Sequence, residues 1–168
     1  MNAEEIEQNY NVEVRTSARS GRIVSEWWTN ALTGEPDRPG DLPARTEYDE
    51  ETGIISMQWW RDGKRQREDD KPSMIKIAPK TGVWIVESHL AFNEFHRVGD
   101  KPATIFRDEQ GRTKEVSYWH LGKLHRSIGP AKIKYDPVSG DIVQQEFWRH
   151  GIQVEFPENS SELDFQPN

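Results

Sequence analysis

Residues 121–136, LGKLHRSIGPAKIKYD, contain the pattern from which the fold of this chain can be predicted. A glycine-bearing turn is followed by a His-Arg pair, then by Pro130-Ala131, and then by a run in which Ile133 and Tyr135 alternate with polar residues. Alternation with a period of two is typical of a half-buried β-strand. Because proline has no backbone N–H to donate, Pro130 suits the start of that strand.

The same pattern recurs along the chain. Arg38, Arg67, Arg97 and Arg126 follow one another at 29, 30 and 29 residues. Each is followed four or five residues later by a proline and then by a small residue: Pro43-Ala44, Pro72-Ser73, Pro102-Ala103 and Pro130-Ala131. A glycine comes next in each unit, at Gly53, Gly82, Gly111 and Gly140. Agreement of several register marks over four units predicts a repeat architecture. We number the units from their arginines.

Each unit predicts two strands and two turns. After the small residue comes an alternating strand, and then a turn such as DEETG (49–53) or DPVSG (136–140), whose glycine can adopt the positive φ of a tight hairpin loop. The next strand ends in aromatic residues, as in IISMQWW (54–60), and a second turn such as RDGK (61–64) leads back. No stretch shows helical periodicity with caps. We therefore expect an all-β, elongated antiparallel β-meander of about 29-residue hairpin repeats, with roughly eight to ten strands and little or no helix.

The acidic charge of the chain is concentrated at its ends. Residues 1–10 and 157–168 each carry three acids and no Lys or Arg, so the net charge of −7 falls to −1 for residues 11–156. This division predicts an acidic N-terminal tail or edge cap (1–10), a single repeat domain (11–156) and an acidic, disordered C-terminal tail (157–168). A nearly neutral body lacks the basic footprint of a nucleic-acid-binding protein.

Composition also bears on location and chemistry. The chain has no cysteine, and it contains no apolar run long enough to cross a membrane, so we expect a cytoplasmic protein without membrane association. No nucleophile elbow, phosphate loop or dinucleotide turn is present, which predicts a protein that is not an enzyme and has no cofactor. The five histidines include His96 and His125 at the same repeat position, which we interpret as structural residues and not as metal ligands.

Two sets of residues are candidates for binding. Adjacent residues of a strand point to opposite faces, so one tryptophan of each Trp-Trp doublet should enter the core, and the other should lie exposed or be covered by other parts of the chain. Exposed members would form an aromatic strip suited to binding; its candidates are Trp27, Trp28, Trp59, Trp60, Trp119 and Trp148. The repeat-spaced Arg38, Arg67, Arg97 and Arg126 are candidates for binding or for a structural ladder. In three of the units an aspartate follows the arginine by three residues (Asp41, Asp70 and Asp100), so Arg–Asp pairs could join one unit to the next.

Units of the form G-K-x-H-R-x-x-G-P-A-x-I-x-Y-D-x-x-x-G resemble the MORN-like repeat proteins of bacteria, phages and large DNA viruses, which include an antitoxin-type branch. The resemblance covers roughly residues 20–150 and is best in 121–140. The usual MORN unit is shorter and is built on Tyr-x-Gly pairs that are absent here. The resemblance implies an elongated, curved sheet of stacked hairpins used for binding, and no catalytic residue.

These observations favour a non-catalytic, protein-binding repeat module. The resemblance adds an inhibitory role by occlusion, as an antitoxin, an immunity protein or a phage anti-defence protein. The alternative is an intracellular carbohydrate- or small-ligand-binding β module that uses the tryptophan strip. Self-association through the edge strands is a further expectation, because unpaired edges can pair with another chain.

Overall fold

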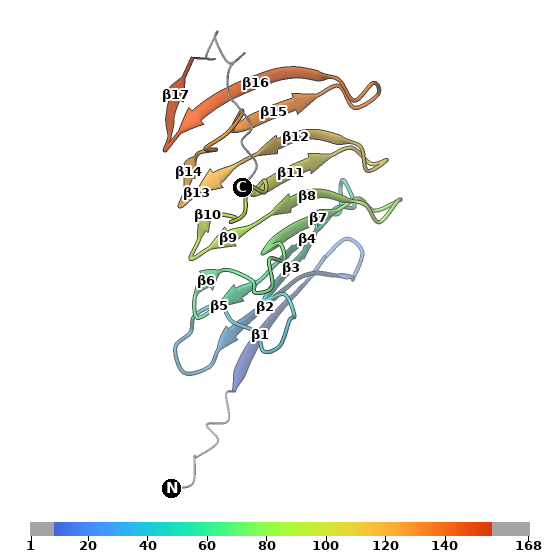
Figure 1. The fold of residues 1–168 in the computed structure, drawn as a ribbon. Helices are drawn as coiled ribbons and strands as arrows, with labels where there is room; N and C mark the ends of the chain where they lie inside the picture. Colours follow the sequence, from blue (N-terminus) through green and yellow to red (C-terminus); the bar gives the residue numbers. More distant parts are fainter. Residues whose placement is uncertain (1–8, 156–168) are drawn as a thin grey trace, which may run out of the picture.

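The computed structural model describes residues 9–155, which form an all-β fold with no helix in that range. Eleven strands build one antiparallel sheet, in which each strand of the chain lies beside the preceding one of the sheet (Figure 1). In spatial order these are β1 (Tyr10–Thr16), β2 (Ile23–Asn30), β3 (Arg45–Tyr48), β4 (Ile55–Gln58), β7 (Met74–Ile77), β8 (Trp84–Ser88), β11 (Thr104–Arg107), β12 (Thr113–Ser117), β15 (Lys132–Tyr135), β16 (Ile142–Arg149) and β17 (Ile152–Val154).

The all-β antiparallel meander expected from the sequence is thus confirmed, with eleven strands in the main sheet where eight to ten were expected. The expectations for the two tails fall almost wholly on residues 1–8 and 156–168, which lie outside the described part of the chain; β1 already begins at Tyr10. Within residues 9–155, no helix is available that could cross a membrane.

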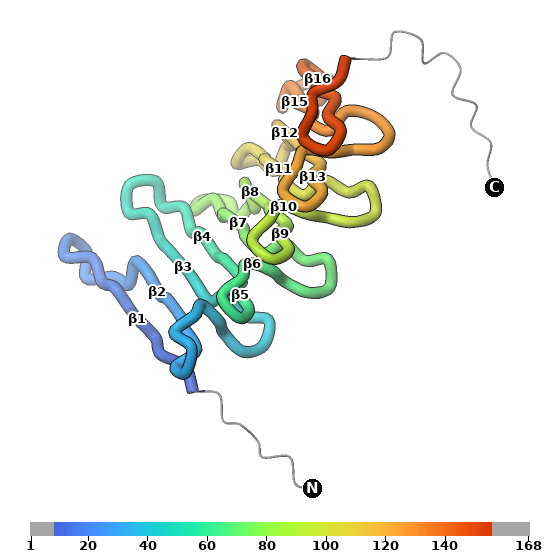
Figure 2. The backbone as a smooth tube through the Cα atoms, turned by 90° about the vertical axis from the view of Figure 1, so that its left-hand side faces the viewer, coloured from blue at the N-terminus to red at the C-terminus, as the bar shows by residue number. Residues whose placement is uncertain are grey.

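The second turn of each unit closes a short hairpin of its own. These hairpins are β5 (Trp60–Arg61) with β6 (Lys64–Arg65), β9 (Leu90–Ala91) with β10 (Glu94–Phe95), and β13 (Trp119–His120) with β14 (Lys123–Leu124). They follow one another beside the main strands as a second column (Figure 2). Backbone hydrogen bonds connect them, because Asn93 N–H donates to the Arg65 carbonyl and Gly122 N–H to the Phe95 carbonyl.

Both residues at the tip of each short hairpin have positive φ, as two-residue hairpin turns of the favoured hand require. The second tip residue is Gly63, Asn93, Gly122 or Gly151, which adopts this conformation easily. The first is less usual: Phe92 has φ of 53° and Leu121 has φ of 46°. Both side chains are exposed.

The core is thin and runs along the sheet. Consecutive strands place Met57, Ile75, Glu87, Ile105, Val116 and Ile133 beside one another in register. The small residues after the prolines are fully buried, which explains why they are small: Ala44, Ala103 and Ala131 have no exposed surface, and Ser73 has almost none. A larger side chain at these positions would have no space without moving the backbone.

Candidate functional site

Three of the four repeat-spaced arginines join their unit to the one before it, whereas Arg38 pairs with Glu26. Arg67 pairs through Nε and Nη2 with both carboxylate oxygens of Asp41, at 2.6 and 2.9 Å. Arg97 makes the same pair of bonds with Asp70, and Arg126 makes them with Asp100. The Nη1 group of each donates to a carbonyl within its own unit, that of Pro72, Pro102 or Pro130. The geometry therefore assigns these arginines to a structural ladder.

The ladder also explains the acidity of its aspartates. Hydrogen bonds from Arg67 and then Lys71 hold the pKa of Asp41 far below its usual range, and Arg97 and Lys101 do the same for the pKa of Asp70. Arg126 lowers the pKa of Asp100. All three carboxylates are ionised at neutral pH, when each bidentate pair is at full strength.

Aromatic rings lie beneath the arginines. The guanidinium carbon of Arg67 is 3.8 Å from the centre of the Trp59 ring, and that of Arg126 is 3.8 Å from the Tyr118 ring. Arg38 lies 4.1 Å from the Trp28 ring in the same way. These contacts cover one face of each ring and add cation–π attraction to the ladder.

The six candidates Trp27, Trp28, Trp59, Trp60, Trp119 and Trp148 do not form an exposed strip. Trp59 is 7% exposed and the other five are half-buried. Other aromatic rings cover part of these side chains: Trp60 packs against Trp27 of β2, and Trp119 packs against Phe95 of β10. Trp84, which the sequence analysis passed over, is the one exposed tryptophan of the seven, at 42%.

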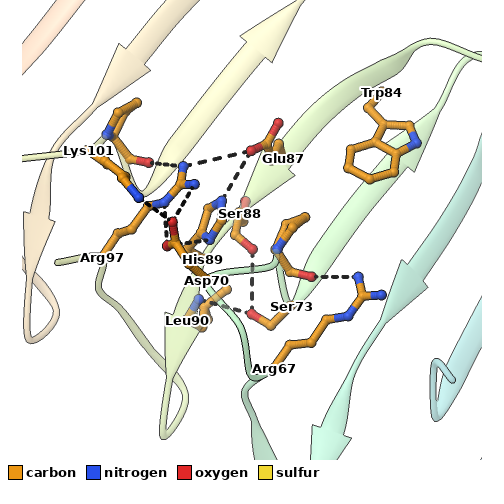
Figure 3. Close-up of polar contacts among 12 residues, drawn as sticks. Arg67, Asp70, Ser73, Trp84, Glu87, Ser88, His89, Leu90, Arg97 and Lys101 are labelled. Carbon is orange, nitrogen blue, oxygen red and sulfur yellow. Dashed lines mark hydrogen bonds and ion pairs between the residues drawn. The ribbon is translucent and has the colours of Figure 1, made fainter. Parts of the chain in front are cut away.

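A buried ionic cluster marks the junction of the second and third units (Figure 3). His89 occupies the repeat position of Trp59 and Tyr118 and is 4% exposed. Its Nε2 lies 3.1 Å from Glu87 Oε1, and its Nδ1 lies 3.9 Å from Asp70 Oδ1. Glu87 also accepts a hydrogen bond from Arg107. These partners lower the pKa of Glu87 despite its burial, the bond from His89 being the main cause. The cluster joins residues of both units around the buried His89, so we interpret it as structural.

Two grooves run between the short hairpins and the arginine-bearing loops. The first groove, of about 370 Å³, is lined by residues 38, 40–42, 59–61, 66–69, 71, 90 and 91. The second groove, of about 450 Å³, is lined by residues 97–101, 118–120, 125–128 and 150. Apart from residues 71 and 90, each position of the first groove has its counterpart 59 residues later in the second. The two grooves therefore occupy equivalent positions on the repeat scaffold, two units apart.

Several sequence-predicted residues meet in these grooves. Trp59, Trp60, Arg38 and Arg67 line the first, whereas Trp119, Arg97 and Arg126 line the second. Trp27, Trp28 and Trp148 line neither of them. The ladder arginines and the aromatic rings form the shared frame, so any difference in binding between the grooves comes from the other lining residues.

Those other residues differ sharply between the grooves. Where the first groove has Arg61, Gln66 and Ala91, the second has His120, His125 and His150. Where the first has Glu68 and Asp69, the second has Ser127 and Ile128. Ile128 and Val98 are 79% and 68% exposed, so the second groove has an apolar rim of two residues, where the first groove has Leu42 at 51%.

The second groove holds most of the histidines of the chain. The ring centre of His120 lies 4.9 Å from that of His96 and 6.0 Å from that of His125. His150 is 6.4 Å from His120 and stacks on His125 at 4.0 Å. We call these four residues the histidine cluster. Repeat position indicated His96 and His125 only; the other two join them because successive hairpins stack, which the sequence does not reveal.

The hydrogen bonds of the cluster define its chemistry. The backbone N–H of His150 donates to Nδ1 of His125 at 3.2 Å, so a neutral His125 carries its proton on Nε2. That nitrogen lies 3.3 Å from the Ser127 hydroxyl. A general base would need a free lone pair on Nε2 to take the serine proton, so this tautomer is wrong for nucleophilic catalysis. Within residues 9–155, no three His, Cys, Asp or Glu side chains have the geometry of a metal site.

Comparison of the chain with protein-family models, curated proteins and solved structures gave no match.

Proposed function

We propose that the chain is a protein-binding module of the MORN-like repeat type, and that the second groove and its apolar rim form its partner-binding surface. The observation that carries this proposal is the pair of grooves itself. One scaffold position occurs twice with the same arginine and aromatic frame, yet the second copy has two highly exposed apolar residues at its edge, Val98 and Ile128, where the first has Leu42. Exposed apolar groups gathered at a groove are typical of protein-interaction sites.

The expected mode of action is occlusion. An elongated sheet with a groove on one side is suited to cover a partner's surface without any chemistry of its own. We therefore propose an inhibitory role of the antitoxin, immunity or anti-defence type for a protein that acts in the cytoplasm. The support for inhibition is the resemblance of the units to that branch of repeat proteins, whereas the support for binding is the groove.

Affinity capture from host lysate tests the proposal, with mass spectrometry as the readout. The informative bait is Ile128→Asp, because the counterpart of Ile128 in the first groove is Asp69 and the scaffold already accepts an aspartate there. The matched control is Val138→Asp, since Val138 is equally exposed, at 80%, but lies in the β15–β16 turn. We expect one stoichiometric partner with the wild-type and Val138→Asp baits and its loss with Ile128→Asp. Equal recovery by all three baits would reject the groove as the interface.

A further inference from the structure

The histidine cluster lacks the negative charge that buried or crowded histidines ordinarily have beside them. None of its four members forms an ion pair or hydrogen bond with an Asp or Glu of residues 9–155, whereas His89 has a carboxylate near each ring nitrogen. The first groove is lined by three acids, and the second only by Asp100, which is already paired with Arg126.

The groups that face the cluster are mostly cationic. Arg149 lies close enough to disfavour protonation of His125, and Lys123 lies beside the Gly151 turn next to His150. Arg126 and Lys101 line the same groove, where Arg126 is paired with Asp100 and Lys101 with Asp70. Glu94 is the nearest acid on a neighbouring hairpin, beside the Gly122 turn. Burial and then the neighbouring rings lower the pKa of His125, and burial followed by His120 lowers that of His96.

Protonation of His96 and His125 is therefore less favourable in the folded protein than in a free histidine, because their pKa values are lowered. An anion in the groove would reverse this, because it would supply the missing counter-charge. The Ser127 hydroxyl and the ammonium group of Lys101, half of whose surface is open, add donors at the same place. By reciprocal linkage, a ligand that raises the proton affinity of the histidines must bind more tightly as the pH falls.

We propose that the second groove receives the carboxylate side chains of an acidic segment on the partner protein, with His120 and His150 protonating as the segment binds and His125 donating a hydrogen bond from Nε2. This inference rests on the proposed function, because it names the chemistry of the surface that the partner presents to the groove. The apolar rim of Val98 and Ile128 then contacts apolar side chains that flank the acidic ones.

A labelled oligoglutamate peptide, followed by fluorescence anisotropy, tests the inference without the natural partner. Its affinity should rise about tenfold for each proton taken up between about pH 7.5 and about pH 5.5. An oligoglutamine peptide of the same length should not bind at either pH. An affinity for oligoglutamate that is the same at both pH values would overturn the inference.

The first groove supplies variants that the scaffold accommodates. His125→Gln and His150→Ala copy Gln66 and Ala91, and together they should weaken peptide binding and reduce its pH dependence, because only His120 is left to protonate. His120→Arg copies Arg61 and fixes a positive charge at every pH, so it should strengthen peptide binding at about pH 7.5. Circular dichroism confirms that each variant is folded. Unchanged peptide binding in the double variant would contradict the inference.

The two proposals fail separately. If Ile128→Asp loses a captured partner but oligoglutamate does not bind, the anion inference is wrong and the interface stands. If oligoglutamate binds with the expected pH dependence but all baits recover the same proteins, the proposed function is wrong and the anion site stands.

Discussion

The guanidinium group of Arg97 forms two hydrogen bonds with the carboxylate of Asp70, which lies 27 residues earlier and belongs to the preceding unit. The same pairing occurs on either side of it, so three bidentate pairs connect four units. In a thin sheet these pairs contribute a larger share of the cohesion between units than they would in a protein with a deep core.

Substitution of Asp70 tests the strength of the ladder. Asp70→Asn keeps the shape of the side chain but removes the charge that accepts bonds from Arg97 and Lys101. We expect the free energy of unfolding to fall by about 1–2 kcal/mol, because the pair is partly shielded from solvent. Urea denaturation measures the change. Asp69→Asn is the control, since Asp69 is highly exposed and contacts only Lys71 at 3.4 Å; a loss of stability as large as that of Asp70→Asn would contradict the ladder.

The ladder also predicts how stability responds to acid. The pKa values of Asp41, Asp70 and Asp100 are lower in the folded protein than in an unfolded chain. Their contribution is therefore fully present above the unfolded value, near pH 4, and is lost as the pH falls from there toward the folded values. The urea midpoint should drop steeply below about pH 4 in the wild type. A variant with all three aspartates changed to asparagine should show a shallower slope in that range; an unchanged slope would rule out this origin.

The buried ionic cluster at Glu87 gives a second stability test. Glu87→Gln removes the charge that accepts hydrogen bonds from Arg107 and His89. Because the site is buried, we expect a loss of about 2 kcal/mol, measured by urea denaturation. Glu115→Gln is the matched control: Glu115 lies on the opposite face of the sheet and pairs with Lys132 at 3.5 Å. An unchanged free energy of unfolding in Glu87→Gln would show that the cluster adds nothing to stability.

The histidine cluster should make the free protein less stable at mildly acidic pH. The pKa values of His96 and His125 are lower in the folded state, so the unfolded chain binds protons first as the pH falls through about 6.5. Folding stability is therefore lost on going from about pH 7.5 to about pH 5.5. His96→Gln combined with His125→Gln copies Gln66 at both repeat positions and should remove part of this loss. If the variant loses as much folding stability over this pH range as the wild type does, the prediction is wrong.

The repeat register made the fold and the ladder predictable. Arg and Asp recur at the spacing of the units. Stacked hairpins bring equivalent positions of neighbouring units together, so Arg67 lies within hydrogen-bonding distance of Asp41. The sequence also shows the small residue after each proline, and the structure supplies the reason, because a fully buried position admits little else.

The exposure of the tryptophans was not predictable in the same way. Alternation correctly separates the two faces of the Trp59-Trp60 doublet, since Trp59 packs under Arg67 and Trp60 packs against Trp27. It does not reveal that other aromatic rings cover part of the second face. The grooves were missed because they lie between two columns, and nothing in a single unit indicates the second one.

Hydrogen–deuterium exchange of the protein bound to its captured partner tests the central claim most directly. We predict slower exchange in the loops of the second groove, residues 97–101 and 125–128, and no change in the β15–β16 turn around Val138. Protection confined to β1 or to the open face of the sheet, with the groove loops unaffected, would show that the partner binds elsewhere.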